Sequence, residues 1–325
     1  MPVSDKSTVS DKPTAADKSP ISEHPMWYVL GAGSIGCLFA AHMQRAGIPI
    51  TLVVRDPSQC DLLQNVGGIT LETDSRSERI AVPCLAANAM PRDCAIAQLL
   101  VCTKAHQTGA AIAAMRANIA ANATLVLLQN GMGVREELLE QLPRAEILHA
   151  LSTEGAWRRE RFHVVHAGRG ETLLGGGNPV QVKTVWSELQ ACGLDMHVVD
   201  DIAERLWTKL AINCVINPLT ALHRCRNGEL LNLANINEHT RNICDELVNI
   251  AATQGVILNS VQLQQRVLAV MQSTASNQSS MLQDVLRGQA TEIDYLNGYV
   301  VKLAELANLA ARANRELLVA IKNLA

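Results

Sequence analysis

A glycine-rich turn near the amino terminus separates a short apolar run from a helical segment. The apolar run is Met26–Leu30, the turn is Gly31-Ala-Gly-Ser-Ile-Gly36, and the helical segment is Cys37–Ala46. A second apolar run, Ile50–Val54, completes about the length of one strand–helix–strand unit. In this setting the three glycines permit a tight turn, close approach of a pyrophosphate, and close packing of helix on strand. The sequence therefore predicts a Rossmann-type dinucleotide-binding fold.

The end of the second strand indicates which dinucleotide binds. NAD-binding folds usually place an acid there to bind the ribose 2′-hydroxyl, whereas here Arg55 stands at about that position. A guanidinium matches the 2′-phosphate of NADP through two parallel hydrogen bonds. Asp56 is the alternative, because a shift of one residue would make it the NAD-type acid. We favour NADP.

Further strand patterns follow in the same rhythm. The segments 99–102, 124–129 and 147–151 lead into Lys104, Asn130 and Ala156. Ligands of open parallel sheets bind beyond the carboxyl ends of the strands, so these residues are candidate ligand contacts. Taken singly, Lys104 also fits a solvated loop lysine, and Asn130 with its following glycine fits a plain turn.

The pattern changes near residue 200. Residues 161–199 contain three strand-like runs that we expect to extend the sheet, whereas the chain from Ile202 is helical, with a last helix expected over roughly 293–323. The segment Thr291-Glu-Ile-Asp294 matches a helix start, where Glu292 would at least complement the helix dipole. We therefore expect a doubly wound α/β domain over 26–200 and an all-helical domain over 201–325.

A polar stripe crosses one apolar helical segment. Lys209, Asn213 and Asn217 recur at every fourth position and so share one helix face, whereas Leu210, Ile212, Val215 and Ile216 occupy the other faces. Unpaired buried polar groups cost roughly 1–3 kcal/mol each, so the stripe needs partners. Those partners are either neighbouring backbone groups, in a structural cluster, or a ligand.

Composition excludes several classes of protein. The 325 residues are 48% hydrophobic, which suits two domains, and the net charge of −3 without a basic block argues against a nucleic-acid surface. No apolar run is long enough to span a membrane. The nine cysteines form no Cys-x-x-Cys pair, and we expect them to be reduced, as in a cytoplasmic protein. No metal-ligand spacing is found.

Residues 1–25 differ from the rest of the chain. Asp-Lys recurs three times amid Ser, Thr, Pro and Ala, without the apolar side chains that folding requires. The segment has neither a hydrophobic signal core nor the arginines of a mitochondrial transit peptide. We expect a disordered tail.

From Trp27 to about Glu305 the chain resembles the ketopantoate reductase (2-dehydropantoate 2-reductase) family. The resemblance is carried by the glycine turn and by the segments Asn130–Gly133, Lys209–Ala221, Asn227–Leu230, Ser279–Asp284 and Thr291–Tyr295, in the order of the family. Residues 1–25 match nothing in it. Near the carboxyl terminus, the family usually has a Gly and a Pro before its last helix. This sequence has Asn308 and Arg312 at about those positions.

The resemblance implies NADPH-dependent reduction of ketopantoate to pantoate, a step of pantothenate and coenzyme A synthesis. It makes Lys209 the general acid and also a substrate contact. It implies cofactor contacts from Gly31, Ala32, Gly33, Ser34, Ile35, Gly36, Arg55, Lys104, Asn130, Ala156 and Glu292. It implies substrate contacts from Asn213, Asn217, Asn227, Asn277 and Ser280.

The chemistry suits these residue types, because hydride transfer turns a ketone oxygen into an alkoxide that a positioned ammonium can stabilise and protonate. Two alternatives remain open. One is a related hydroxy-acid or opine-type dehydrogenase, and the other is a non-catalytic NADPH-binding sensor. A homodimer through the last helix of the helical domain is also an expectation.

Overall fold

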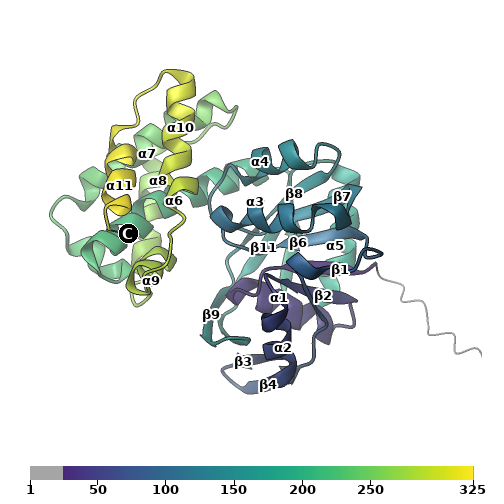
Figure 1. The fold of residues 1–325 in the computed structure, drawn as a ribbon. Helices are drawn as coiled ribbons and strands as arrows, with labels where there is room; N and C mark the ends of the chain where they lie inside the picture. The colour runs from purple at the N-terminus through teal and green to yellow at the C-terminus, as the bar shows by residue number, and fades with distance from the viewer. Residues whose placement is uncertain (1–24, 325) are drawn as a thin grey trace, which may run out of the picture.

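A computed structural model describes residues 25–324, which form two lobes joined by one long helix (Figure 1). The amino-terminal lobe contains an eight-stranded sheet flanked by helices, and the carboxyl-terminal lobe is helical. The tail prediction for residues 1–25 lies outside the described part of the chain but for Pro25. None of the helices in the described residues is both long and apolar enough to cross a membrane.

The sheets are built from short strands. Their bounds are β1 Trp27–Leu30, β2 Ile50–Val54, β3 Ile69–Thr73, β4 Arg76–Ile80, β5 Cys84–Ala86, β6 Ile96–Val101, β7 Ile119–Leu127, β8 Glu146–Ser152, β9 Gly155–Glu160, β10 His163–Gly168, β11 Glu171–Gly175 and β12 Asp195–Val198.

The α-helices divide between the lobes. Those of the first lobe are α1 Ser34–Arg45, α2 Pro57–Asn65, α3 Ala105–Ala114, α4 Val134–Gln141 and α5 Pro179–Leu189. Helix α6, Ile202–His223, leads into the second lobe, which contains α7 Ile236–Thr253, α8 Ser260–Ser273, α9 Ser280–Leu286, α10 Asn297–Ala307 and α11 Arg312–Lys322. Short 3₁₀ segments lie at Ala87–Ala89, Arg116–Asn118, Gln190–Cys192, Asn227–Asn232 and Ile293–Tyr295.

The large sheet has the strand order β12-β11-β8-β7-β6-β1-β2-β5. The pairs from β8 to β5 are parallel, β11 runs antiparallel to β8, and β12 runs parallel to β11. The chain proceeds outward in one direction from β1 to β2 and in the other from β6 to β8. The strand order therefore reverses between β1 and β6, which is where open α/β sheets bind ligands. The predicted Rossmann-type sheet with a helical second part is confirmed.

One expectation about this lobe is wrong. Of the three strand-like runs in 161–199, those at β11 and β12 extend the large sheet, but β10 belongs to a separate four-stranded sheet of order β4-β3-β10-β9. Strand β10 pairs in parallel with β3 and antiparallel with β9. Periodicity identified a strand but not its partner, because the β3–β4 hairpin supplies the edge with which β10 pairs.

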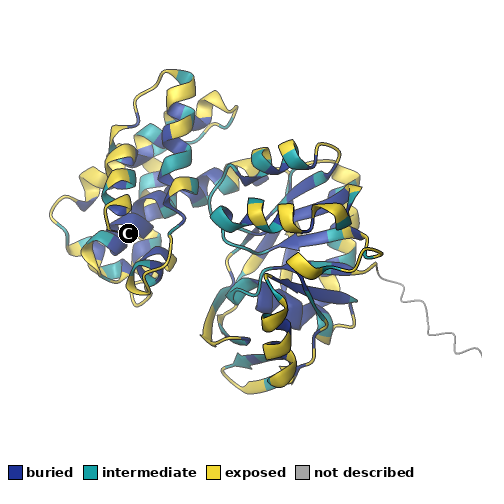
Figure 2. Ribbon diagram, viewed as in Figure 1, coloured by how far each residue is buried: buried dark blue, intermediate teal, exposed yellow. Residues whose placement is uncertain are grey.

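Each lobe has its own apolar interior (Figure 2). The first lobe packs side chains such as Trp27, Leu38 and Leu52 on one cluster and Leu99 and Leu125 on another. The second lobe packs the inner faces of α6, α7 and α8, with α10 and α11 against them. Burial of apolar surface at roughly 25 cal/mol per Å² is the main favourable term in each core.

Helix α6 passes through the middle of the second lobe despite a proline in its interior. Pro218 has no N–H to donate to the Cys214 carbonyl one turn earlier, so that oxygen loses its helical partner. The fully buried amide of Asn297 donates to it instead, at 3.1 Å, and also donates to Asn314 Oδ1 at 3.0 Å. Asn314 donates in turn to the Glu246 carboxylate at 2.7 Å. This network ties α6, α10, α11 and α7 together.

The expected last helix over 293–323 is two helices. Asn308 adopts a left-handed conformation, with φ of 54°, and ends α10, and α11 begins again at Arg312. The expected helix start at Thr291 is also different, because residues 293–295 form one 3₁₀ turn rather than an α-helix. Asparagine tolerates the left-handed region better than most residues, so it serves here as the helix stop.

The expectation of nine reduced cysteines is also wrong in part. Cys60 on α2 and Cys84 on β5 form a disulfide, and seven cysteines are free. Pairing of β5 with β2 brings these two residues, 24 apart in sequence, to a Cα separation of 5.6 Å. Sequence spacing could not show this pair because no short motif joins its members.

Candidate active site

A cleft of about 400 Å³ opens at the carboxyl ends of the parallel strands. Its walls come from the glycine turn after β1, the loops after β6, β7 and β8, and the first lobe's β9. The helical lobe closes it with residues on and around α9 and with Glu292. The cleft thus lies between the lobes and at the reversal point of the strand order.

The glycine turn is shaped by close backbone approach. A Cβ on Gly36 would lie 1.9 Å from the Gly31 carbonyl oxygen, so only glycine fits at this position. At Gly33, by contrast, the nearest atom to an added Cβ is the Cys102 carbonyl oxygen at 3.8 Å, so a methyl group fits there in ordinary van der Waals contact. Gly33 is the N-cap of α1 and provides no side-chain cap, so first-turn N–H groups are available to an anion.

The residues present fit a dinucleotide. Gly33, Ser34 and Ile35 line the cleft beside these N–H groups, as the phosphates of a dinucleotide require. Across the cleft, Gln129 donates its amide to the Thr103 carbonyl oxygen at 2.7 Å and to the Thr108 hydroxyl. Its Oε1 atom is buried and has no hydrogen-bond partner within residues 25–324.

Both candidate ribose contacts, Arg55 and Asp56, lie directly after the end of β2. The Asp56 carboxylate accepts from the Ser58 hydroxyl at 2.5 Å and from the Gln59 amide at 3.1 Å. These bonds lower the pKa of Asp56 and commit its oxygens to the first turn of α2. Arg55 is exposed directly after β2. Asp56 is thus engaged within its own turn, and Arg55 remains the predicted group facing a 2′-substituent.

Two charged contacts connect the lobes at the amino terminus of α3. Lys104, the N-cap of α3, forms an ion pair with the buried carboxylate of Asp284 on α9. Glu292 accepts a hydrogen bond from the Ala105 N–H at 2.8 Å. Burial raises the pKa of Glu292, while that hydrogen bond and the nearby lysines oppose the rise. The helix dipole favours a carboxylate at this end of α3, so Glu292 both caps the helix and lines the cleft.

Lys209 projects from α6 toward the carboxyl end of β8. Its ammonium donates to the Ser152 carbonyl oxygen at 3.0 Å and is partly buried. Burial lowers the pKa of Lys209 to about 8, because it disfavours the charged form, and the Glu292 carboxylate counteracts part of that effect. Ser152 precedes Glu154 of the cleft wall by two residues. A lysine whose pKa is lowered to about 8 by burial thus lies at the edge of the cleft.

Of the predicted substrate residues, one lines the cleft and the others lie behind or beside its wall. Ser280 lines the cleft, and Asn277 lies beside cleft residue Gln278. The Asn227 N–H donates to the Asn277 carbonyl oxygen at 3.0 Å, so these two residues are neighbours. Asn213 and the more deeply buried Asn217 share with Lys209 the stripe on α6. Asn213, Asn217, Asn227, Asn277 and Lys209 are not among the residues that line the cleft itself.

The predicted cofactor residues also separate into two groups. Gly33, Ser34, Ile35, Lys104, Asn130, Ala156 and Glu292 line the cleft. Gly31 and Gly36 shape the turn from behind, and the Ala32 carbonyl oxygen accepts from the Arg158 guanidinium at 3.2 Å. Arg55 lies outside the lining. Their roles as ligand contacts remain predictions.

Several cleft residues escaped the sequence reasoning. Gln129, Glu154, Arg158 and Asp284 line the cleft, and none of them had been given a role from sequence. Gln129 had a signal, because it ends a strand directly before Asn130. Asp284 ended one of the segments that carry the family resemblance, but its pairing with Lys104, 180 residues away, had no signal. No group of three or more His, Cys, Asp or Glu side chains in the described part of the chain is placed to hold a metal ion.

A glycine turn at the reversal point of a parallel sheet, a helical lobe closing over it and a partly buried lysine at the junction define a Rossmann-type, dinucleotide-dependent oxidoreductase. Family models described as "Ketopantoate reductase PanE/ApbA" and "Ketopantoate reductase PanE/ApbA C terminal" match residues 27–179 and 201–325. The chain belongs to the ketopantoate reductase family.

Relatives and solved structures agree with this assignment. The chain is 32% identical over 299 residues to the 2-dehydropantoate 2-reductase of Vibrio cholerae, covering 91% of this chain and 96% of that protein. A ketopantoate reductase from Ralstonia eutropha JMP134 has a similar structure, with 26% identity, a TM-score of 0.82, and coverage of 92% and 98%. A D-mandelate dehydrogenase solved with NADH and anilino(oxo)acetate shares the fold, at 19% identity, a TM-score of 0.86, and coverage of 92% and 98%.

Because a methyl group fits at Gly33, the substitution Gly33→Ala tests the role of the glycine turn in cofactor binding. Gly33→Ala should fold with an unchanged melting temperature, because the added methyl group meets nothing closer than 3.8 Å and the φ of −73° suits alanine. It should nevertheless weaken NADPH binding, by roughly tenfold or more, because the methyl group occupies space next to the first-turn N–H groups. Fluorescence titration of NADPH and thermal unfolding measure the two effects.

Gly36→Ala is the matched comparison. Its methyl group would clash with the Gly31 carbonyl oxygen at 1.9 Å, so this variant should lose stability as well as binding. Equal NADPH affinity for Gly33→Ala and wild type would contradict the placement of the phosphates at this turn.

Proposed function

We propose that this protein reduces 2-dehydropantoate (ketopantoate) to pantoate with NADPH, a step in pantothenate and coenzyme A biosynthesis. The carrying observation is the Lys209 ammonium, held by the Ser152 carbonyl oxygen at the edge of the interlobe cleft with a pKa near 8. Membership of the ketopantoate reductase family supports the substrate.

The chain's own residues provide what the reaction needs apart from hydride. NADPH, when bound, supplies the hydride. Lys209 stabilises the negative charge that develops on the keto oxygen and donates the proton that completes the hydroxyl group. Partial burial strengthens this electrostatic effect and keeps the lysine's pKa close to the working pH. Closure of the helical lobe over the cleft would exclude water.

The remaining polar residues would hold the two ligands. Asn213, Asn217, Asn227, Asn277 and Ser280 offer neutral donors and acceptors that suit a carboxylate and hydroxyl groups without competing with the acid. Arg55, exposed after β2 while Asp56 is engaged by Ser58 and Gln59, would bind the 2′-phosphate of NADPH. The cleft wall formed by Asn130, Ala156 and Glu292 would contact the cofactor.

We also propose the wider arrangement of the protein. Residues 26–200 would form the dinucleotide domain and residues 201–325 the substrate domain, since the first lobe has its own apolar core and the second lobe has another, to which α6 belongs. A homodimer through the helical lobe is supported by the apolar side chains of Leu306 and Val319, which are 73% and 52% exposed. We propose a cytoplasmic location on the basis of the reaction.

An oxidation assay tests the function directly. Ketopantoate with NADPH should give a higher kcat/KM than pyruvate, phenylglyoxylate or 2-oxoglutarate, and NADPH should be preferred to NADH. A preference for another 2-keto acid would identify a related hydroxy-acid or opine-type dehydrogenase. NADPH binding without turnover of any keto acid would identify a sensor.

Lys209→Ala should bind NADPH with nearly wild-type affinity and lose turnover. The expected loss in kcat is roughly 10²–10⁴-fold, the usual contribution of a general acid. Stopped-flow or steady-state assays measure the rate, and fluorescence titration measures binding. A kcat close to that of wild type would end the assignment of Lys209 as the proton donor.

The lowered pKa of Lys209 predicts a pH profile for the reduction. The acid must carry its proton, so kcat/KM for the keto acid should be constant below the pKa of about 8 and should fall as the pH rises through it. The Glu292 carboxylate raises this pKa, so in Glu292→Gln the fall should begin at lower pH. An unchanged profile in that variant would contradict the electrostatic contact between the two residues.

A further inference from the structure

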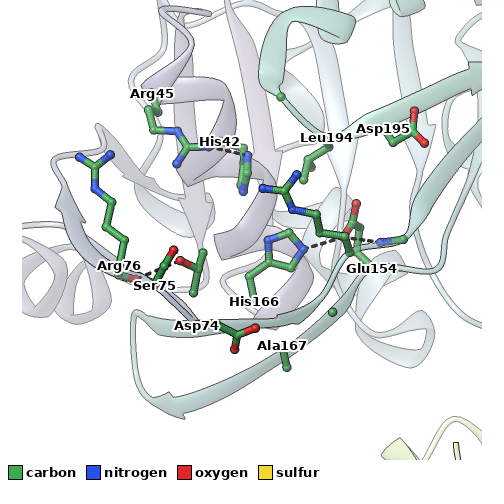
Figure 3. Close-up of a pocket in the computed structure, with 15 residues that line it drawn as sticks. His42, Arg45, Asp74, Ser75, Arg76, Glu154, His166, Ala167, Leu194 and Asp195 are labelled. Atoms are coloured by element: carbon green, nitrogen blue, oxygen red, sulfur yellow. Dashed lines mark hydrogen bonds and ion pairs between the residues drawn. The ribbon is translucent and has the colours of Figure 1, made fainter.

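A second cavity, of about 950 Å³, lies beside the four-stranded sheet and apart from the glycine turn (Figure 3). Its walls are the end of α1, the β3–β4 turn, the β10–β11 loop and the segment 193–195 before and at the start of β12. The proposed reductase chemistry gives this cavity no task. It is larger than the catalytic cleft, and polar side chains dominate its labelled lining.

A buried histidine on this cavity has an unfilled hydrogen-bonding position. His42 is 5% exposed, and its Nδ1 atom lies 3.2 Å from the Cys192 carbonyl oxygen and 3.1 Å from the Arg45 guanidinium. The Nε2 atom is buried and has no hydrogen-bond partner among the described residues. Each ring nitrogen of an imidazole is a donor or an acceptor, and a buried one normally has a partner.

The charges on the cavity wall are unevenly paired. Glu154 is engaged by His166 at 2.6 Å, Asp195 by His197 at 2.9 Å, and Arg76 by Glu78 at 3.2 Å. Arg45 and Arg169 have no carboxylate partner within residues 25–324, and the exposed Asp74 is the other acid on the wall. The lining thus carries three arginines and three carboxylates and is neutral in formal charge, while two of its guanidinium groups are available to a ligand.

We propose that this cavity binds a small organic anion through a carboxylate held by Arg45 and Arg169. The guanidinium fork matches a planar carboxylate through two parallel hydrogen bonds. Such a ligand would give both guanidinium groups the carboxylate partner that they lack within residues 25–324. The site is separate from the catalytic cleft, since neither arginine lines that cleft.

One residue connects the two cavities. Glu154 lines both of them, and its Oε2 atom accepts from His166 and, at 3.0 Å, from the Gly170 N–H. It lies in the turn between β8 and β9, two residues from Ser152, which holds Lys209, and two residues from Ala156 of the cleft. A ligand that alters the His166–Glu154 contact would therefore affect the cleft, and occupancy of the cleft would affect the ligand in return.

Calorimetric titration of citrate into the full-length protein saturated with NADP⁺ tests the site. Citrate should bind wild type, and Arg45→Gln and Arg169→Gln should each weaken it roughly tenfold or more, since each removes a charge-assisted contact. Arg241→Gln, an exposed arginine on α7, is the control and should bind as wild type does. Arg169 is exposed in a loop, so loss of binding there is not a sign of unfolding.

Three results would overturn the proposal. They are no binding of millimolar citrate, binding that both arginine variants leave unchanged, and inorganic phosphate binding as tightly as citrate, which would exclude carboxylate recognition. A kinetic measurement tests the connection through Glu154, which rests on the proposed reductase function. Citrate should change KM for NADPH in wild type and not in Arg169→Gln. The binding titration needs no turnover, so it decides the site even if the reductase assignment fails.

Discussion

The hydrogen bond from Lys209 to the Ser152 carbonyl oxygen joins the two lobes at the point where the chemistry is proposed. One end of it belongs to the helix that enters the second lobe's core, and the other to the end of a strand in the parallel sheet. Burial makes the ammonium costly, and the carbonyl oxygen offsets that cost while fixing its direction. The same burial that lowers the lysine's pKa to about 8 makes it a useful acid.

Three further charged side chains, Glu292, Asp284 and Lys104, lie at the same junction between the lobes. Glu292 caps α3 and raises the pKa of Lys209, and Asp284 pairs with Lys104 at the same helix end. Positive and negative groups thus lie together at the lobe junction, and each has a partner from the other lobe. Glu292 therefore has two positions at once: it contacts the other lobe through the Ala105 N–H, and it forms part of the cleft wall.

In the helical lobe, a hydrogen bond from another helix replaces the one that Pro218 cannot make. Pro218 leaves a carbonyl oxygen of α6 without its helical partner, and Asn297 restores the hydrogen bond from another helix. The polar network continues through Asn314 to Glu246, so buried amides fix how α6, α10, α11 and α7 pack. The stripe residues on α6 can then keep a defined orientation relative to the cleft.

The sequence by itself determined the parts that depend on local pattern. Glycine spacing between a strand and a helix predicted the Rossmann turn, and four-residue spacing placed Lys209, Asn213 and Asn217 on one face of α6. Both follow from backbone geometry that neighbouring residues fix. The family resemblance added the roles of these residues, which pattern alone left open.

Only the tertiary structure decided what depends on partners distant in the chain. Strand β10 paired with β3 instead of the large sheet, Cys60 met Cys84, Asn308 divided the last helix, and Asp284 paired with Lys104 across 180 residues. Glu154 came to lie between two cavities for the same reason. Pairing energies of this kind arise from the packing of the whole chain, and no local window of sequence contains both partners.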